Sequence, residues 1–365
     1  MRVVVSGGGT GGHIYPALAF MRYLEKQEDV EYLYIGTKRG LESKIVPQAG
    51  YAFESIKIEG LKRSLSLENL KTAYYMVTSV IKARKILKEF KPDVVIGTGG
   101  YVCAPVLFAA SLLKIPTIIH EQNSVAGVTN KFLAKWVNKI AICFDDVKKD
   151  FASYSDKVVL TGNPRGQEVV EIKKNPEYLD SIGVQTDLPI VVIFGGSRGS
   201  ERMNEVFVEA LEGFADKNYH VIMVTGEVHY DKINNQITNL EKSLPNVSVF
   251  PYIKDMPQLF QNVDLVVCRS GATTLTELTA LGLASILIPS PYVTNNHQEA
   301  NARSLVDQGA ASMILEKELN AQTMLAEIDH ILLDSHKKEA MAASAKKMGI
   351  VDASSRLTSM IHEML

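Results

Sequence analysis

Short apolar runs alternate with longer segments of helical periodicity along the whole chain. The runs are rich in Val, Ile and Leu, which is typical of buried strands. They occupy residues 2–6, 32–35, 94–96, 117–119, 139–143 and 158–160, and then 190–194, 221–225, 247–250, 265–267, 285–288 and 312–315. Because strands and helices alternate, the pattern predicts parallel sheets covered by helices on both faces, which is an α/β fold.

Two glycine-rich turns divide this pattern into two halves. One turn begins at Gly7, after the first run, and the other follows the run that ends at Phe194. A turn-rich stretch over residues 162–166 closes the first half. We therefore expect two doubly wound, Rossmann-like domains, over residues 1–163 and 164–348. Ligands of open α/β sheets bind beyond the carboxyl ends of the strands, so we expect the two sheets to face a central cleft.

Composition places the chain among ordinary globular proteins. Of its 365 residues, 46% are apolar and 22% are charged, and the net charge of −2 gives no general attraction for nucleic acid. The apolar stretch over residues 102–119 is interrupted by Pro105, Lys114 and Pro116, so it does not predict a membrane span. The N-terminus does not resemble a signal peptide, and the three cysteines lie in or beside apolar runs. We expect a chain with free thiols that stays in the cytoplasm.

Residues 268–301 contain the strongest candidate for a ligand site. A buried run ends at Ser270 and Gly271 and a helix then begins, so several backbone N–H groups point at one spot that favours a phosphate. Glu277 follows one turn later, where a carboxylate can accept hydrogen bonds from two ribose hydroxyls. Gln298 and Asn301 open a further helix, and their amides can meet a sugar. The pattern predicts a nucleotide-sugar pocket, while an ordinary βα unit with helix-capping polar groups fits the spacing equally well.

The first glycine-rich turn matches the dinucleotide-binding pattern G-x-G-x-x-G at Gly7, Gly9 and Gly12. The second predicted strand ends without the acid that binds the ribose of NAD, so NAD is disfavoured. A diphosphate joined to another group fits the bare loop better. His13 follows at the helix start, where the positive helix end favours a neutral imidazole that can act as a general base. A capping or packing histidine is the alternative.

A basic amphipathic segment covers residues 57–91. Its apolar residues are spaced three and four apart on one helical face, and over residues 61–91 eight Lys and Arg oppose two Glu. An apolar patch ringed by cations suits an anionic membrane surface, where each cation contributes about 1 kcal/mol. A second basic helix at residues 131–139 holds the only tryptophan, Trp136. A domain helix with a solvated basic edge fits the same pattern.

Polar loops follow several other predicted strands. Tyr101 and Asn123 lie in loops after two strands of the first half, so we expect both to reach the same cleft as His13. In the second half, Ser197 follows a glycine pair and can donate to a phosphate, and a backbone group near Ile253 can pair with a base edge. Each of these residues also fits the ordinary role of a hydrogen-bonded loop residue.

Seven segments, taken in order, resemble the MurG family of bacterial cell-wall glycosyltransferases, within glycosyltransferase family 28. They begin at Ser6, Ile96, Ile119, Thr161, Phe194, Arg269 and Asn296, and they include Ser-Gly-Gly-Gly-Thr-Gly-Gly-His-Ile-Tyr-Pro and Arg-Ser-Gly-Ala-Thr-Thr-Leu-Thr-Glu. The resemblance spans nearly the whole chain. It implies the two-domain GT-B fold, with the last helix, over about residues 349–365, returning to the first domain.

The resemblance also implies an activity. The family transfers N-acetylglucosamine from UDP-N-acetylglucosamine (UDP-GlcNAc), with inversion, to the undecaprenyl-diphosphate-linked N-acetylmuramoyl-pentapeptide called lipid I. The product is lipid II, a precursor in peptidoglycan synthesis. The family works as a peripheral enzyme at the cytoplasmic face of the cell membrane, where other cell-wall enzymes are candidate partners.

Site residues follow from the same resemblance. It places Glu277 on the ribose hydroxyls, the Ile253 backbone on uracil and Ser197 on the diphosphate. The residues that it places around the phosphates are Ala272, Thr273 and Thr274, and those that it places on the hexose are Gln298 and Asn301. The donor side is completed by Thr10, Gly11, Gly12, Asn123 and Arg165. Arg165 directly follows Pro164, whereas some relatives insert a residue there. The catalytic and acceptor side comprises His13, Tyr101 and Asn123.

The sequence also bears on the mechanism. Asp145 and Asp146 are adjacent rather than spaced as Asp-x-Asp, so we expect a reaction without metal or cofactor. The helix start at residues 271–274 would then stabilise the leaving diphosphate. Two other classes of function remain open. One is a UDP-sugar 2-epimerase, which needs no lipid acceptor, and the other is a non-catalytic, membrane-recruited protein that binds a nucleotide sugar.

Overall fold

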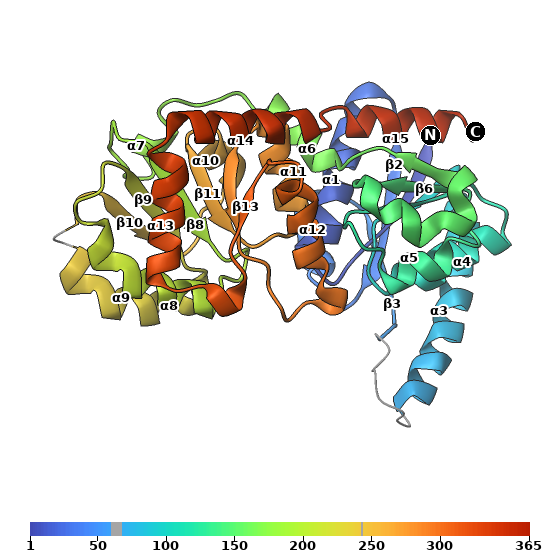
Figure 1. The fold of residues 1–365 in the computed structure, drawn as a ribbon. Helices are drawn as coiled ribbons and strands as arrows, with labels where there is room; N and C mark the ends of the chain where they lie inside the picture. Colours follow the sequence, from blue (N-terminus) through green and yellow to red (C-terminus); the bar gives the residue numbers. More distant parts are fainter. Residues whose placement is uncertain (60–67, 242–243) are drawn as a thin grey trace. The chain divides into compact units, whose positions relative to one another are not determined.

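The computed structural model describes residues 1–59, 68–241 and 244–365. It divides into two compact units, residues 1–168 with 350–365 (unit 1) and residues 169–349 (unit 2). Each unit holds one sheet with helices around it (Figure 1). The division falls inside helix α6 (Pro164–Glu171), a few residues beyond the expected boundary, because the turn-rich stretch leads directly into this helix.

Unit 1 contains a seven-stranded sheet in the order β3-β2-β1-β4-β5-β6-β7, in which all neighbours are parallel. The strands are β1 (Arg2–Ser6), β2 (Glu31–Thr37), β3 (Phe53–Ile56), β4 (Val94–Gly97), β5 (Thr117–Glu121), β6 (Lys139–Ile142) and β7 (Val158–Leu160). The apolar runs did not predict β3, because this edge strand alternates apolar and polar residues and only Ile56 is buried.

Helices cover both faces of this sheet. They are α1 (Gly11–Gln27), α2 (Glu42–Gln48), α3 (Glu68–Phe90), α4 (Cys103–Leu112), α5 (Val128–Leu133), the 3-10 segment η1 (Asp145–Lys157), α6 and α15 (Ala353–His362). Val4 and Val95 face a core that includes residues of α3, α4 and α5. Val3 and Val5 face the opposite core, which includes residues of α1 and α15. The last helix therefore packs on unit 1, where Tyr23 and Ser355 also share a 2.6 Å hydrogen bond.

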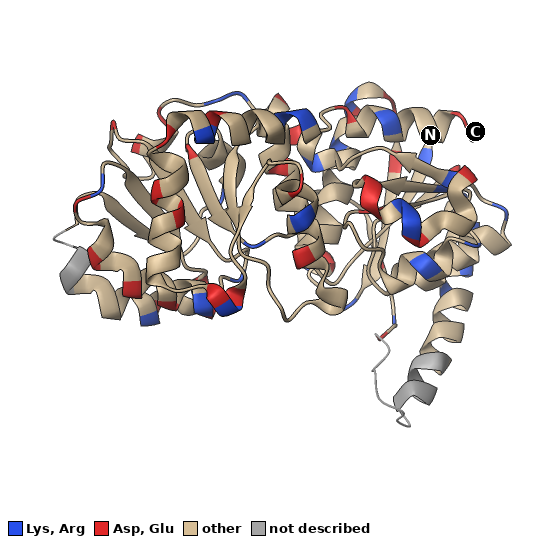
Figure 2. Cartoon of the chain, in the orientation of Figure 1, with Lys and Arg blue, Asp and Glu red and all other residues tan. Residues whose placement is uncertain are grey.

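Unit 2 contains a six-stranded parallel sheet in the order β10-β9-β8-β11-β12-β13. The strands are β8 (Ile190–Phe194), β9 (His220–Val224), β10 (Val247–Phe250), β11 (Leu265–Cys268), β12 (Ala284–Leu287) and β13 (Ser312–Met313). These strands hold no Lys, Arg, Asp or Glu, and in Figure 2 the charges of this unit lie on helices and loops. A sheet buried on both faces has no solvated side for such charges.

The helical segments of unit 2 surround this sheet. They are α7 (Tyr178–Ser181), α8 (Glu201–Ala210), η2 (Leu211–Phe214), α9 (Glu227–Glu241), α10 (Met256–Phe260), α11 (Ala272–Leu281), η3 (Thr294–Asn296), α12 (His297–Val306), η4 (Glu316–Glu318), α13 (Ala321–Leu332) and α14 (Ser335–Met348). Among all the helices described in either unit, none is long and apolar enough to span a bilayer.

Strand order fixes where ligands can bind in each unit. In unit 1 the chain moves outward from β1 in one direction and then returns to add β4 on the other side of β1. Unit 2 repeats this arrangement with β8 and β11. Loops that follow two such neighbouring strands diverge to opposite faces and leave a crevice at the carboxyl edge of the sheet.

Candidate functional site

In unit 1 the loop after β1 and the loop after β4 lie against each other. The Gly8 N–H donates to the Gly99 carbonyl at 3.1 Å. Gly99 and Gly100 have φ angles of +114° and +85°, and a Cβ on Gly100 would collide with the Gly8 carbonyl. Side chains at these two positions would therefore push the loops apart, which explains why glycines stand there.

His13 lies in the first turn of α1, between these loops. Its Nδ1 lies 2.8 Å from the Gly8 carbonyl oxygen. A carbonyl oxygen only accepts, so Nδ1 carries the hydrogen and Nε2 is the basic nitrogen of the neutral ring. A Cβ on Gly99 would come within 2.6 Å of the imidazole, so the second loop packs closely on the ring. The structure thus presents a partly exposed imidazole with a defined tautomer, as a general base requires.

Tyr101 follows the same β4 loop and is 40% exposed. Burial raises the pKa of its phenol, and the charges of Glu42 and Glu59 raise that pKa further. The hydroxyl is therefore protonated at neutral pH and can donate a hydrogen bond to a ligand. The structure brings Tyr101 to the same edge of the sheet as His13.

Asn123 is oriented by the buried carboxylate of Glu121, a residue to which the sequence analysis gave no role of its own. Glu121 Oε1 accepts from the Asn123 N–H at 3.1 Å and from its Nδ2 at 3.2 Å. Glu121 Oε2 accepts from the Gly127 N–H at 2.9 Å and from Asn130 Nδ2 at 2.8 Å. The carboxylate therefore ties the loop after β5 to the start of α5 and sets the direction of the Asn123 amide.

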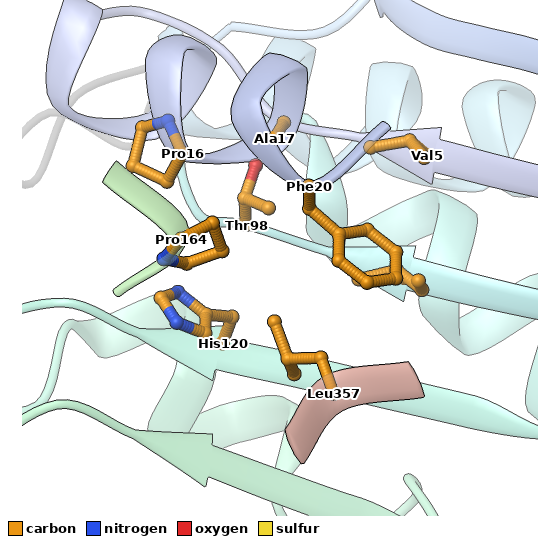
Figure 3. A pocket seen from close by; sticks show the side chains of 9 residues that line it. Val5, Pro16, Ala17, Phe20, Thr98, His120, Pro164 and Leu357 are labelled. Atoms are coloured by element: carbon orange, nitrogen blue, oxygen red, sulfur yellow. The ribbon is translucent and has the colours of Figure 1, made fainter. Parts of the chain in front are cut away.

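A small apolar hollow lies near this loop but belongs to the packing of unit 1. It is lined by residues of β1, α1, β4 and α15, and Figure 3 shows His120 beside Pro164, with Phe20 and Leu357 across the hollow. His120 is 1% exposed, and its Nε2 lies 2.9 Å from the Gly162 carbonyl oxygen. Burial lowers the pKa of His120, so its imidazole is neutral and holds the loop after β7.

The other donor-side residues of unit 1 lie in two places. Thr10 is exposed at the start of α1, where Gly11 and Gly12 form the first turn, beside His13. Arg165 begins α6 and forms an ion pair with Glu168, which also binds Arg22 at 2.6 Å. The guanidinium of Arg165 is therefore already part of a charge network within unit 1.

In unit 2 the turn between β11 and α11 forms a bare helix N-terminus. Gly271 is the N-cap residue, no side chain caps the helix, and no acidic residue lies in the first turn. Ala272, Thr273 and Thr274 form that turn, whose N–H groups have no partner within the helix. The buried Thr273 Oγ1 has no hydrogen-bond partner among the residues that the structure describes. This geometry can bind an anion such as phosphate.

Glu277 and the residues of α12 surround this turn. Glu277 is one turn into α11 and is 7% exposed, and its charge contributes to the raised pKa of Cys268, whose main cause is burial. Asn301 is fully buried and donates from Nδ2 to the Ser270 carbonyl at 3.2 Å. Gln298 is partly exposed, and its Oε1 accepts from the Ser290 N–H at 2.8 Å. Asn301 therefore holds the β11–α11 turn in place, whereas Gln298 lies nearer the surface.

Arg269 is a residue of this site that the sequence analysis did not single out. It forms an ion pair with Glu316, and it also donates to Ser200 Oγ at 2.6 Å and to the Ile288 carbonyl at 3.1 Å. The guanidinium thereby links the β11 turn to the loop after β8, where Ser197 is exposed. In the sequence, the only feature that could have identified Arg269 as a site residue was its position directly before Ser270.

Ile253 lies in the loop after a third strand of this sheet. It follows β10, which is two strands away from β8 in the sheet, and it is 4% exposed. In the described parts of the chain, no three His, Cys, Asp or Glu side chains are grouped so that they could hold a metal ion.

Comparisons with known proteins agree with this architecture. Residues 3–142 match the glycosyltransferase family 28 N-terminal domain, and residues 190–357 match the family 28 C-terminal domain. A Bacillus cereus protein named UDP-N-acetylglucosamine–N-acetylmuramyl-(pentapeptide) pyrophosphoryl-undecaprenol N-acetylglucosamine transferase 1 is 53% identical over 367 aligned positions, which cover 100% of each chain.

Solved structures show the same fold. The crystal structure of Acinetobacter baumannii MurG superposes with a TM-score of 0.79 at 28% identity and covers 99% of each chain. A Neisseria meningitidis UDP-GlcNAc 2-epimerase, bound to UDP-GlcNAc, superposes with a TM-score of 0.70 at 15% identity and 100% coverage of each chain, which shows a shared fold alone. The chain has the GT-B fold, and it belongs to glycosyltransferase family 28, as the motifs in its sequence predicted.

Proposed function

We propose that this protein transfers N-acetylglucosamine from UDP-GlcNAc to the 4-hydroxyl of N-acetylmuramyl-(pentapeptide) pyrophosphoryl-undecaprenol, lipid I, and inverts the anomeric centre. The observation that carries the proposal is the bare N-terminus of α11, with Glu277 one turn beyond it. A helix start of small residues suits a diphosphate, and a carboxylate at that distance suits a ribose. The two substrates are those in the name of the Bacillus cereus relative.

Unit 2 is the proposed donor-binding unit. The N–H groups of residues 272–274 donate hydrogen bonds to the diphosphate, and Ser197 also donates to it from the loop after β8. Glu277 accepts hydrogen bonds from the ribose hydroxyls, and the Ile253 backbone pairs with uracil. Gln298 forms hydrogen bonds with the hexose. The buried Asn301 holds the Ser270 turn in position beside the hexose.

Unit 1 is the proposed acceptor-binding unit, and it also contributes Thr10, Gly11, Gly12, Asn123 and Arg165 to the donor side. The acceptor oxygen attacks the anomeric carbon, and the bond from that carbon to UDP breaks. His13 Nε2 takes the proton of the acceptor hydroxyl, while the Tyr101 hydroxyl and the Asn123 amide orient the sugars. The charge that develops on the leaving UDP is met by the start of α11, so the step needs no metal ion.

Transfer itself is the first prediction. With labelled UDP-GlcNAc and a short-chain lipid I analogue, we expect labelled disaccharide product in the presence of EDTA. Product that forms without EDTA but not with EDTA would contradict the metal-free mechanism. Interconversion of the UDP-sugar without the lipid would indicate a 2-epimerase, and binding of UDP-GlcNAc without turnover in either assay would indicate a non-catalytic binding protein.

Replacement of the proposed base is the second prediction. We expect His13→Ala to lower kcat by roughly 10²- to 10⁴-fold, because it removes the proton acceptor, with the KM for UDP-GlcNAc nearly unchanged. Steady-state kinetics with both substrates varied measures the two effects separately. A variant whose donor KM rises while kcat stays the same would show that His13 binds the donor and does not act as the base.

The ribose contact is the third prediction. We expect Glu277→Ala to weaken UDP binding by about 10- to 100-fold, because hydrogen bonds to a charged acceptor contribute roughly 1.5–3 kcal/mol. Calorimetric titration with UDP measures the dissociation constant. Glu277→Gln keeps one acceptor oxygen and should lose less affinity, and an unchanged dissociation constant in the alanine variant would exclude the ribose role.

An exposed apolar surface on α3, α4, α5 and the turn after α5 in unit 1 supports binding at a membrane. We call it the α3–α5 surface, and its members are Tyr74, Val77, Ile81, Leu112, Val128, Phe132 and Trp136, all at least 40% exposed. α3 packs on α4 and α4 on α5, with Phe108 in ring contact with both Phe132 and Trp136. The described part of α3 extends away from the sheet (Figure 1). The expected patch members at residues 61–67 lie outside the described residues, and the side chains at residues 68–73 are likewise undescribed.

Cations flank this surface. Lys135 Nζ lies 5.3 Å from the centre of the Trp136 ring, Lys85 is exposed on α3 beside Glu89, and Lys131 forms an ion pair with Asp150 at 3.0 Å. Apolar side chains with neighbouring cations suit the headgroup region of an anionic bilayer. The protein would therefore act as a peripheral enzyme on the cytoplasmic face of the cell membrane, where it meets its lipid-linked acceptor.

Vesicle binding is the fourth prediction. We expect a Val77→Ser and Ile81→Ser double variant to bind vesicles of anionic phospholipid roughly tenfold more weakly, because the apolar area that enters the interface is lost. Both side chains are more than 60% exposed, so the fold should not change. Val228→Ser, at an 82% exposed position of α9 in unit 2, is the matched control and should bind as the parent does. Equal binding by all three proteins would exclude the α3–α5 surface.

A further inference from the structure

Glu42 is a fully buried carboxylate that the proposed function does not use. It is the first residue of α2, it is 0% exposed, and it lies beside the glycine loop after β1. Gly8, Gly36 and Gly40 surround its side chain. A Cβ on Gly8 would come within 2.5 Å of Glu42 Oε1, and one on Gly36 within 2.6 Å of Cγ. Three stretches of backbone thus approach the carboxylate as closely as only glycine permits.

Three uncharged donors hold this carboxylate. Oε1 accepts from the Thr37 N–H at 2.9 Å and from the Thr37 hydroxyl at 2.6 Å. Oε2 accepts from the Gly9 N–H at 3.1 Å. The bonds from Thr37 fix the carboxylate at the end of β2, and the bond from Gly9 connects it to the loop that carries His13.

The connection to His13 runs through a single peptide group. The Gly9 N–H that donates to Glu42 and the Gly8 carbonyl that accepts from His13 Nδ1 belong to the same planar unit. A negative charge at the N–H end polarises the amide and makes its carbonyl oxygen a stronger acceptor. A stronger acceptor at Gly8 favours hydrogen on Nδ1 and increases the electron density on Nε2.

We infer that Glu42 is a positioning residue for the transfer reaction, which acts on His13 through the Gly8–Gly9 peptide. It holds the imidazole in the Nδ1–H tautomer and increases the basicity of Nε2. The arrangement resembles a carboxylate–histidine pair in which one peptide group has been inserted between the partners. This inference rests on the proposed role of His13 as the base.

Other contacts hold the loop independently of Glu42. The structural support that the carboxylate gives to the loop can therefore be separated from its effect on His13. The Gly8 N–H donates to the Gly99 carbonyl at 3.1 Å, and the Tyr34 hydroxyl donates to the Gly7 carbonyl at 2.9 Å. Tyr34 is as buried as Glu42 and supports the same loop, one peptide away from the Gly8–Gly9 group. Tyr34→Phe therefore removes a buried hydrogen bond from the loop and leaves the path from Glu42 to His13 intact.

Glu42→Gln is the fifth prediction, because glutamine keeps the shape of the side chain and removes its charge. We expect kcat to fall about tenfold with the KM for UDP-GlcNAc within about twofold of the parent value. Nitrogen-15 NMR of labelled histidine should show His13 as the Nδ1–H tautomer in the parent protein and a shift toward Nε2–H in Glu42→Gln. The control Tyr34→Phe should lower Tm while it keeps kcat within about twofold and the His13 signal unchanged.

Several outcomes would overturn the inference. One is a parallel fall of kcat and Tm in both variants, which would make Glu42 a structural support only. Another is an Nε2–H tautomer in the parent protein, and this measurement needs no variant to fold. If His13→Ala retains full kcat while the tautomer shift occurs, the base assignment fails and the polarising contact stands. If the parent enzyme does not transfer the sugar, the proposed function itself is wrong, whichever tautomer His13 has.

Discussion

The contact between the loops after β1 and β4 is the constraint on which the site of unit 1 depends. β1 and β4 are neighbours because the chain adds β2 and β3 on one side of β1 and then returns to add β4 on the other side. Gly99 and Gly100 adopt positive φ angles, and the absence of their side chains lets the β4 loop touch Gly8 and the His13 ring. The Gly8 carbonyl then faces Nδ1, so the backbone itself determines which nitrogen of His13 is basic.

Unit 2 has the same strand topology, but its loops present different chemical groups. The loops after β8 and β11 are again neighbours, but here the first turn of α11 exposes N–H groups where unit 1 presents an imidazole. Arg269 does not face this turn as a free cation, because it forms an ion pair with Glu316 and also donates to Ser200 Oγ and to the Ile288 carbonyl. In the proposed donor site, the positive potential for an anion therefore comes from the helix start, and the arginine links the two loops.

The sequence predicted the residues that stand directly after strands, because parallel strands place all their carboxyl ends at one edge. Tyr101 and Ser270 lie in loops after β4 and β11, and His13 and Glu277 lie in the helices α1 and α11 that begin at the same edges. It did not single out Glu42 or Arg269, since a glutamate at a helix start and an arginine after a strand read as ordinary solvated charges. Burial and the identity of their partners are properties of the packed chain, and the roles inferred for these two residues rest on them.

Alternation of apolar runs with helices determined the α/β class and the two parallel sheets, because the period of side-chain burial is local in the sequence. The motifs after the strands determined the family, because each motif is also a local stretch of sequence. Tertiary structure alone decided that Tyr74, Val77 and Ile81 face solvent, although their spacing also fits a core helix. It alone decided that one peptide group joins Glu42 to His13, because that contact spans residues far apart in the chain and depends on the fold of both loops.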